Sequence, residues 1–265
     1  NGYPRFSRNT RLKTVICEDK IEILDPPSKP QKPKSNLFMK LFPSFGMLIA
    51  AGAMAFMGGT MIIFSLISCT IAIITAVVGV MEGKKEFREK TANRIEVYQK
   101  YIASKRQEIE ECRNREWTER NEIYIPAEQE IQQVETFSPD LFDRTPQDED
   151  FLCVRLGSGP IESARQVNYK KQEKLEIEDD LSLLPEQTAS FYKELQNAPV
   201  ICDLKNVNAV GITGEEADRF ELLKLIVTDV ALRHFAADVK LFFVAEKEHA
   251  GRMHLFRFLP GAYCV

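Results

Sequence analysis

A long run without charged residues dominates this sequence. Residues 41–81 contain no Asp, Glu, Lys or Arg, although 28% of the 265 residues in the chain are charged. One membrane-spanning helix needs only about 20 apolar residues, so the run is too long for one span and suitable for two. The sequence therefore predicts a membrane protein rather than a soluble globular one.

Two glycines, Gly58 and Gly59, lie near the middle of the run, where a tight reversal is needed. We expect one transmembrane helix over residues 41–57 and a second over residues 60–81. Positive charges flank the run on both sides, at Lys29, Lys32, Lys34 and Lys40 before it and at Lys84, Lys85, Arg88, Lys90 and Arg94 after it. Because positive flanks stay in the cytoplasm, the pattern predicts a multi-pass protein with both termini cytoplasmic.

Small residues recur at four-residue spacing in both predicted spans. The sets are Gly46/Ala50, Ala51/Ala55, Ser68/Ala72/Ala76 and Thr75/Gly79. Such faces let helix backbones approach closely in lipid, either within this hairpin or between copies in a homo-oligomer. No ionisable group lies inside the spans, so the hairpin is expected to be an anchor or one contributor to a shared pore.

The polar segments on either side of the run differ in composition and in expected conformation. Residues 1–40 read as a cytoplasmic linker that follows a preceding domain, with a Pro- and Lys-rich extended stretch at 25–35. Residues 82–140 read as a helical stalk, because 84–125 contain neither Gly nor Pro. An apolar seam follows 3-4 spacing along it: Ile95, Tyr98, Ile102, Ile109 and Cys112. Pro126 ends this helix, and the seam is expected to pack on a short second helix after it or to join neighbouring copies.

From residue 141 to residue 265 the pattern changes to α/β. Strands are expected at 151–156, 200–204, 208–212 and 239–245, with a helix over 219–234. The apolar run 239–245 is typical of a strand buried on both faces. The overall prediction is an α/β chain with membrane helices: a two-helix transmembrane hairpin, a long helical stalk, and an incomplete P-loop-like (RecA-like) domain built on a βαβ unit.

The turn before the helix in that unit occupies the place of a phosphate-binding loop. Gly211, Thr213 and Gly214 are the candidate nucleotide-contacting residues, through their backbone groups. An active GxxxxGK[ST] loop next needs Gly, Lys and Ser or Thr. Those positions hold Glu216, Ala217 and Asp218. We expect a loop that has lost catalysis; weak nucleotide binding is the alternative.

Other functional classes find little support. The six cysteines show no CxxC spacing and are expected to be reduced intracellular thiols, and the three histidines do not cluster with other ligands. We therefore expect no metal site and no catalytic residue. Net charges of +5, −3 and −6 for residues 1–40, 82–140 and 141–265 exclude an obvious nucleic-acid surface.

Several segments resemble one family in order along almost the whole chain. They are YPRFSR at 3–8, PPSKP at 26–30 before the paired span, DFLCVRLGSG at 150–159, APV at 198–200, the 211–214 turn and FLP at 258–260. Two positions depart from the family pattern. Phe142 follows Leu141 where the family often has Trp, and Gly261 follows Leu-Pro where the family often has His. The chain thus resembles the membrane-bound motor ATPases of type VII secretion systems, the EssC/EccC family of the FtsK/SpoIIIE class, and its Firmicute EssC branch in particular.

The resemblance implies the region between N-terminal forkhead-associated domains and C-terminal tandem ATPase domains. It implies a protein of the bacterial cell membrane that assembles with copies of itself and with other secretion-system membrane proteins, and that exports WXG100-type proteins. ATP and Mg²⁺ would bind in the distal domains, and no cofactor is expected in this segment. The alternative function is a membrane-tethered domain that binds or hydrolyses nucleotide in its own right.

Overall fold

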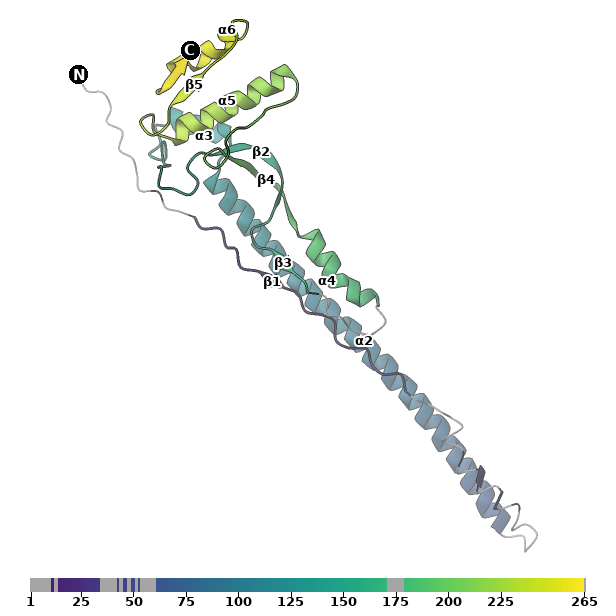
Figure 1. Ribbon diagram of the computed structural model, residues 1–265. Coiled ribbons are helices and arrows are strands. Elements are labelled where there is room, and N and C mark those ends of the chain that lie inside the picture. The colour runs from purple at the N-terminus through teal and green to yellow at the C-terminus, as the bar shows by residue number, and fades with distance from the viewer. Residues whose placement is uncertain are drawn as a thin grey trace. The chain divides into compact units, whose positions relative to one another are not determined.

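The computed structural model describes residues 11, 14–33, 42, 45–46, 49–50, 52, 61–170 and 179–264. The architecture is mixed α/β, with one very long helix and small sheets (Figure 1). The chain divides into two compact units. The stalk unit consists of Ile23–Gln107 and Tyr169–Gln187, and the head unit consists of Asn1–Glu22, Glu108–Asn168 and Thr188–Val265.

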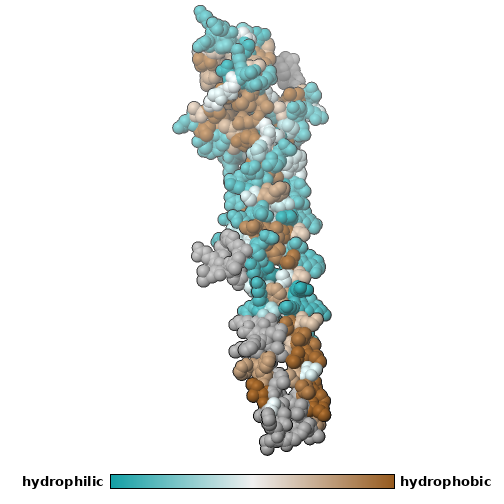
Figure 2. Space-filling view, turned by 90° about the vertical axis from the view of Figure 1, so that its right-hand side faces the viewer, coloured by the Kyte–Doolittle hydropathy of each residue, from teal (hydrophilic) through white to brown (hydrophobic). Residues whose placement is uncertain are grey.

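Helix α2 runs from Met61 to Ile123 over 63 residues. Its first part is apolar, with an 18-residue window of mean hydropathy 2.0, which is long and apolar enough to cross a membrane. Exposed apolar side chains gather at this end (Figure 2), among them Ile63, Phe64, Leu66, Ile67, Ile71, Ile74 and Met81. Thr70 and Thr75 turn their hydroxyl groups back onto carbonyls four residues earlier, so each hydroxyl is hydrogen-bonded within the helix.

The second predicted span therefore lies within a helix that continues without a break into the polar stalk, as expected. Most of the first predicted span, 41–57, and the reversal at Gly58 and Gly59 lie outside the described residues. The few described residues of that span, such as Phe42 and Ile49, are helical and exposed.

In the stalk unit, the extended N-terminal segment lies along α2. The Tyr98 hydroxyl donates to the Leu24 carbonyl (2.8 Å), and the Leu24 amide donates to the Tyr101 hydroxyl (2.9 Å). Arg94 Nε donates to the Pro27 carbonyl at 2.6 Å. At the Tyr98 position of the apolar seam, the structure therefore has this extended segment rather than the short second helix after Pro126.

The same segment continues toward the apolar end of α2. Pro33 lies beside Gly83, where its Cβ would be 3.6 Å from a Cβ added to the glycine. Asp179 accepts a hydrogen bond from Arg94 Nη1 (2.7 Å) and also from the Ser182 amide (3.2 Å), as a helix-capping carboxylate does. It thereby joins α2 to the start of α4, which runs from Asp180 to Phe191.

The head unit is built around one antiparallel strand pair and two helices. Strand β2 (Cys153–Glu162) pairs with β4 (Glu194–Asp203), and Val154 and Ala198 are fully buried within the pair. Helix α5 (Glu216–Arg233) packs on β2 and on α3 (Ala127–Glu135). Pro126 separates α2 from α3, as the sequence predicts.

Two short parallel pairs complete the described structure. β1 (Ile21–Glu22) pairs with β3 (Val167–Asn168), and β5 (Leu241–Phe243) pairs with β6 (Ala262–Cys264). Between the last two strands lie α6 (Ala250–Met253) and the 3₁₀ helix His254–Phe258.

The C-terminal part of the α/β prediction needs correction. Residues 208–212 form no strand, and within the described residues β4 and β5 do not share a sheet, so β4, α5 and β5 do not form the expected βαβ unit. Strand β5 is not buried on both faces, because Phe242 is 67% exposed and the neighbouring Val244 is 82% exposed. A two-stranded sheet supplies too little structure to cover both faces of an apolar strand.

Candidate functional site

The predicted phosphate loop forms an exposed turn. Gly211, Thr213 and Gly214 all lie at the surface, and α5 begins two residues later at Glu216, three residues before the predicted start at 219. Gly214 has φ +134°, a conformation that favours glycine. The stretch before the turn is irregular rather than a strand, so these residues lack the strand that normally presents such a loop.

The first turn of α5 is already paired with basic side chains. Arg252 Nη1 of α6 donates to Glu216 Oε1 at 2.7 Å, and His249 Nδ1 lies 3.8 Å from the same oxygen. The Arg252 guanidinium also lies 5.7 Å from the centre of the Phe220 ring. Acidic groups at a helix N-terminus are favoured by the helix dipole, so this end of α5 is stable without an anion.

A second constellation surrounds the DFLCVRLGSG segment. Its first residue, Asp150, accepts two hydrogen bonds from Arg11, at 2.8 Å from Nη1 and 2.7 Å from Nη2. Burial alone would raise the pKa of Asp150, but the hydrogen bonds from Arg11 and the charge of Arg144 outweigh burial and hold the pKa below its usual value. This carboxylate is therefore ionised and ties the N-terminal segment to the head unit.

Arg144 is almost completely buried, with 1% of its surface exposed. Its Nη2 donates to the Ile123 carbonyl at the end of α2 (3.2 Å), and its Nη1 donates to the Cys153 carbonyl at the start of β2. The guanidinium stands 5.0 Å from the centre of the Tyr124 ring and 3.4 Å from Asp150 Oδ2. One cation thus caps the long helix and holds the first residue of the central strand pair.

Leu152, within the same segment, has an unusual backbone held by a histidine. Its φ of 63° lies in the left-handed region, which is costly for a branched side chain. The Leu152 amide donates to His234 Nε2 (3.0 Å), so the proton of the neutral ring lies on Nδ1, which donates to the Val230 carbonyl (3.0 Å). Burial lowers the pKa of His234, which keeps the ring in this neutral form.

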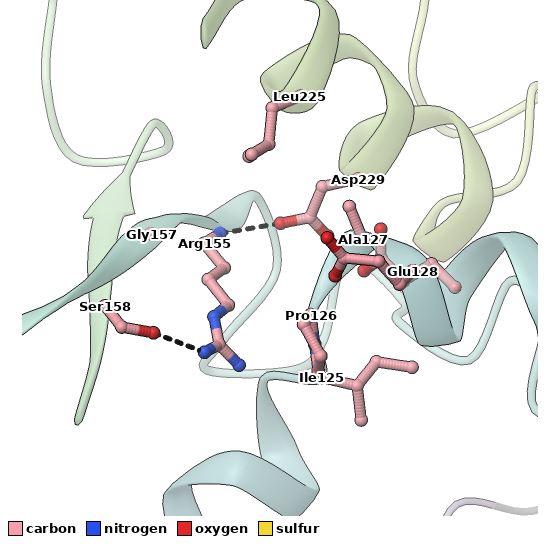
Figure 3. A pocket seen from close by; sticks show the side chains of 10 residues that line it. Ile125, Pro126, Ala127, Glu128, Arg155, Gly157, Ser158, Leu225 and Asp229 are labelled. Carbon is pink, nitrogen blue, oxygen red and sulfur yellow. Dashed lines mark hydrogen bonds between the residues drawn. The ribbon is translucent and has the colours of Figure 1, made fainter. Parts of the chain in front are cut away.

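The contact between α3 and α5 contains two buried carboxyl groups and one buried guanidinium. Arg233 Nε donates to Glu130 Oε1 (3.0 Å) and lies 3.8 Å from Asp229 Oδ1. Asp229 Oδ2 in turn accepts the Arg155 amide at 2.6 Å (Figure 3). Burial, followed by the charge of Asp229, raises the pKa of Glu130 to about 7, despite the opposing effect of Arg233.

A cavity of about 200 Å³ opens beside these groups. Figure 3 shows Asp229 and the Arg155 side chain facing it from α5 and β2, and the Arg155 guanidinium donates to Ser158 Oγ at 2.7 Å. The lining residues are Ile125, Pro126, Ala127, Glu128, Glu130, Arg155, Gly157, Ser158, Leu225 and Asp229. The cavity lies where the end of α2, α3, β2 and α5 meet, so any change in their packing alters it.

Sequence reasoning emphasised the 150–159 segment but did not identify the buried charges around it. The buried charges are Glu130, Arg144, Asp229 and Arg233, and the partly exposed Arg11 and the neutral, buried His234 lie beside them. One signal was available: Asp229 and Arg233 are four residues apart on α5, on the face that also buries Val227 and Val230. Charged residues on an apolar helical face are almost always paired. Among the described residues no cluster of potential ligands could hold a metal ion.

Comparison with known proteins supports the resemblance. No family model matches the chain. Over 262 residues, 97% of the chain, it is 22% identical to the ESX secretion system protein YukB of Bacillus subtilis. It is 25% identical over 98% of its length to the type VII secretion system protein EssC of Staphylococcus aureus, and 23% identical over 97% to the ESX secretion system protein EccC of Geobacillus thermodenitrificans.

The chain spans only 17–18% of the length of these curated relatives. Their matches nevertheless extend from the N-terminal segment through α2 and the head unit. The resemblance inferred from the DFLCVRLGSG segment and its companions is therefore confirmed: over nearly its entire length, this chain is similar to type VII secretion proteins of the EssC, EccC and YukB group.

Proposed function

We propose that this chain is the membrane anchor, stalk and degenerate ATPase-like domain of a type VII secretion motor in a bacterial cell membrane. The observation that carries the proposal is α2, which continues from a membrane-compatible apolar segment to Ile123, where buried Arg144 holds its last turn. In this role α2 transmits movements of the head unit, driven by ATP hydrolysis in distal domains, toward the membrane.

We further propose that residues 41–57 and 60–81 form a transmembrane hairpin with both flanks in the cytoplasm. The position of Pro33 beside Gly83 supports this arrangement, because Gly83 lies just after the apolar part of α2. The charge-free run begins eight residues after Pro33 in the sequence, and positively charged residues lie on both sides of it. Membrane lipid, further copies of the chain and other secretion-system membrane proteins are the proposed partners.

Protease protection tests the anchor. Trypsin added outside intact spheroplasts is expected to leave the chain whole, whereas trypsin added to inverted membrane vesicles should cleave both residues 11–34 and the head unit. Cleavage of either flank from outside the spheroplast would refute the hairpin topology.

The coupling role is tested in cells that carry the complete motor. Arg144→Gln is expected to abolish export of a small helical WXG100-type protein while membrane insertion and ATP hydrolysis by the distal domains persist. Lys224→Gln, at an exposed ion pair with Glu221 on α5, serves as the matched control and should leave export unchanged. Normal export by the Arg144 variant would contradict the coupling role.

A further inference from the structure

Arg165 lies between two thiols that are far apart in the sequence. Its Nη2 donates to Cys17 Sγ at 2.6 Å, and its Nη1 donates to Cys112 Sγ at 2.8 Å. Cys17 belongs to the segment before β1, Cys112 belongs to α2, and all three residues lie in the head unit.

Backbone contacts on both sides of Arg165 hold this arrangement. On one side, the Ala164 amide donates to Glu116 Oε1 at 2.9 Å, and Glu116 is one helical turn after Cys112. On the other side, the Ile21 amide donates to the Gln166 carbonyl at 3.0 Å, next to the β1–β3 pair. The backbone on both sides of Arg165 is therefore held beside α2 and β1.

Both sulfurs contact one guanidinium, which must move aside before they can bond. Because the two terminal nitrogens of a guanidinium are held in a rigid fork, the sulfurs are at most about 8 Å apart. Cys17 is exposed on an extended segment and also donates to Asp19 Oδ2 at 3.2 Å. A thiolate is the reactive form of cysteine, and the Arg165 guanidinium lies beside both sulfurs.

We propose that Cys17 and Cys112 form a reversible disulfide when the protein meets a peroxide. In the first step the Cys17 thiolate attacks hydrogen peroxide and becomes a sulfenic acid, and hydroxide leaves. The Cys112 thiolate then attacks the sulfenic sulfur; the S–S bond forms, the S–O bond breaks, and a second hydroxide leaves. Two thiols have lost two electrons and two protons, and peroxide has become two molecules of water. Thiol reductants reverse the reaction.

Such a bond would covalently fix the N-terminal segment to α2. Disulfides in reducing compartments are mostly transient and redox-sensing, which fits a site that is exposed at Cys17 and partly covered at Cys112. The expected structural consequence is slower amide exchange at Ile21, because β1 can no longer separate from β3 freely.

Peptide mapping tests the proposal on the whole chain in detergent micelles. After a short exposure to hydrogen peroxide, alkylation and trypsin, we expect a linked pair of peptides, TVICEDK (14–20) and QEIEECR (107–113), which dithiothreitol separates. Arg165→Gln should slow its formation several-fold, whereas Arg165→Lys should retain part of the rate. Exposed Arg115→Gln, outside both peptides, is the control for a general loss of positive charge.

Three results would overturn the proposal: Cys17 stopping at sulfinic acid without linkage, preferential pairing of either cysteine with Cys69, Cys153 or Cys202, or an equal rate in the Arg165→Gln variant. Mixing ¹⁴N- and ¹⁵N-labelled protein before oxidation identifies linkage within one chain. Linked peptides of mixed isotope content would show a bond between copies and would also overturn it.

Discussion

Replacing Glu130 with glutamine removes the charge of a buried carboxyl group whose pKa is raised to about 7. The change keeps the shape of the side chain and an oxygen that can accept the 3.0 Å hydrogen bond from Arg233 Nε. In the native protein the raised pKa means that folded α3 binds a proton more tightly than opened α3 does. The associated stability is fully present below the unfolded pKa of about 4.5 and is lost as the pH rises through about 7.

The size of the effect follows from these two pKa values. If opening of α3 returns Glu130 to water, linkage makes that opening about 70-fold easier at pH 8 than at pH 5, equivalent to about 2.5 kcal/mol. The Glu130→Gln variant lacks this proton and should lose that part of the pH dependence. Contributions from groups that do not interact with Glu130 are shared by both proteins and cancel in the comparison.

Hydrogen–deuterium exchange of peptides covering α3 measures this difference directly. Rates corrected for intrinsic exchange should show protection of α3 falling between pH 5 and pH 8 in the native chain and staying nearly level in the variant. Glu128→Gln, on the exposed side of the same helix, is the matched control and should keep the native slope. The reasoning fails if native and Glu130→Gln proteins show the same slope.

Three further predictions address the other sites. Arg144→Met should lower the free energy of unfolding by roughly 3–5 kcal/mol, because it leaves buried carbonyls and the Asp150 carboxylate without the guanidinium. Denaturant unfolding followed by near-ultraviolet circular dichroism measures this change, and a loss below about 1 kcal/mol would contradict the prediction. Calorimetry with millimolar Mg-ATP should give no binding heat, since Glu216 already pairs with Arg252; a saturable signal removed by Gly214→Val would instead support nucleotide binding. Because the pKa of His234 is lowered, acidification below about pH 6.5 should weaken the structure around Leu152. The expected sign is faster amide exchange at Leu152 after correction for intrinsic exchange, and an unchanged rate at pH 5 would argue against the assigned tautomer.

The long helix was predictable because its signals are local. An apolar run and then a stretch without Gly or Pro define α2, and Pro126 marks its end in both sequence and structure. What covers the helix was not predictable in the same way. Leu24 and Tyr98 are 74 positions apart, and no local pattern shows that an extended segment rather than a helix lies there.

The strand and site predictions also depended on whether the sequence signal was local or came from distant residues. The β2 and β4 regions were found because each is an apolar segment that has a partner to pair with. Residues 208–212 are also largely apolar, but they pair with no strand among the described residues, and a strand without a hydrogen-bonded neighbour is not stable. Similarly, the 150–159 segment was singled out correctly, whereas its dependence on Arg11, Arg144 and His234 arises only from long-range contacts.

The N-terminal segment beside α2 places a constraint on how sequences of this kind can change in length. From Leu24 to Pro33 an extended chain advances about 30 Å, and from Tyr101 back to Gly83 a helix advances about 27 Å. The two paths match because one extended residue covers the rise of about two helical residues. A single insertion or deletion in either path would shift one set of contacts past the other, and in α2 it would also rotate the contacting face by about 100°. Length changes here are therefore expected to be accepted only in compensating combinations that restore both, such as about three extended residues against about seven helical ones.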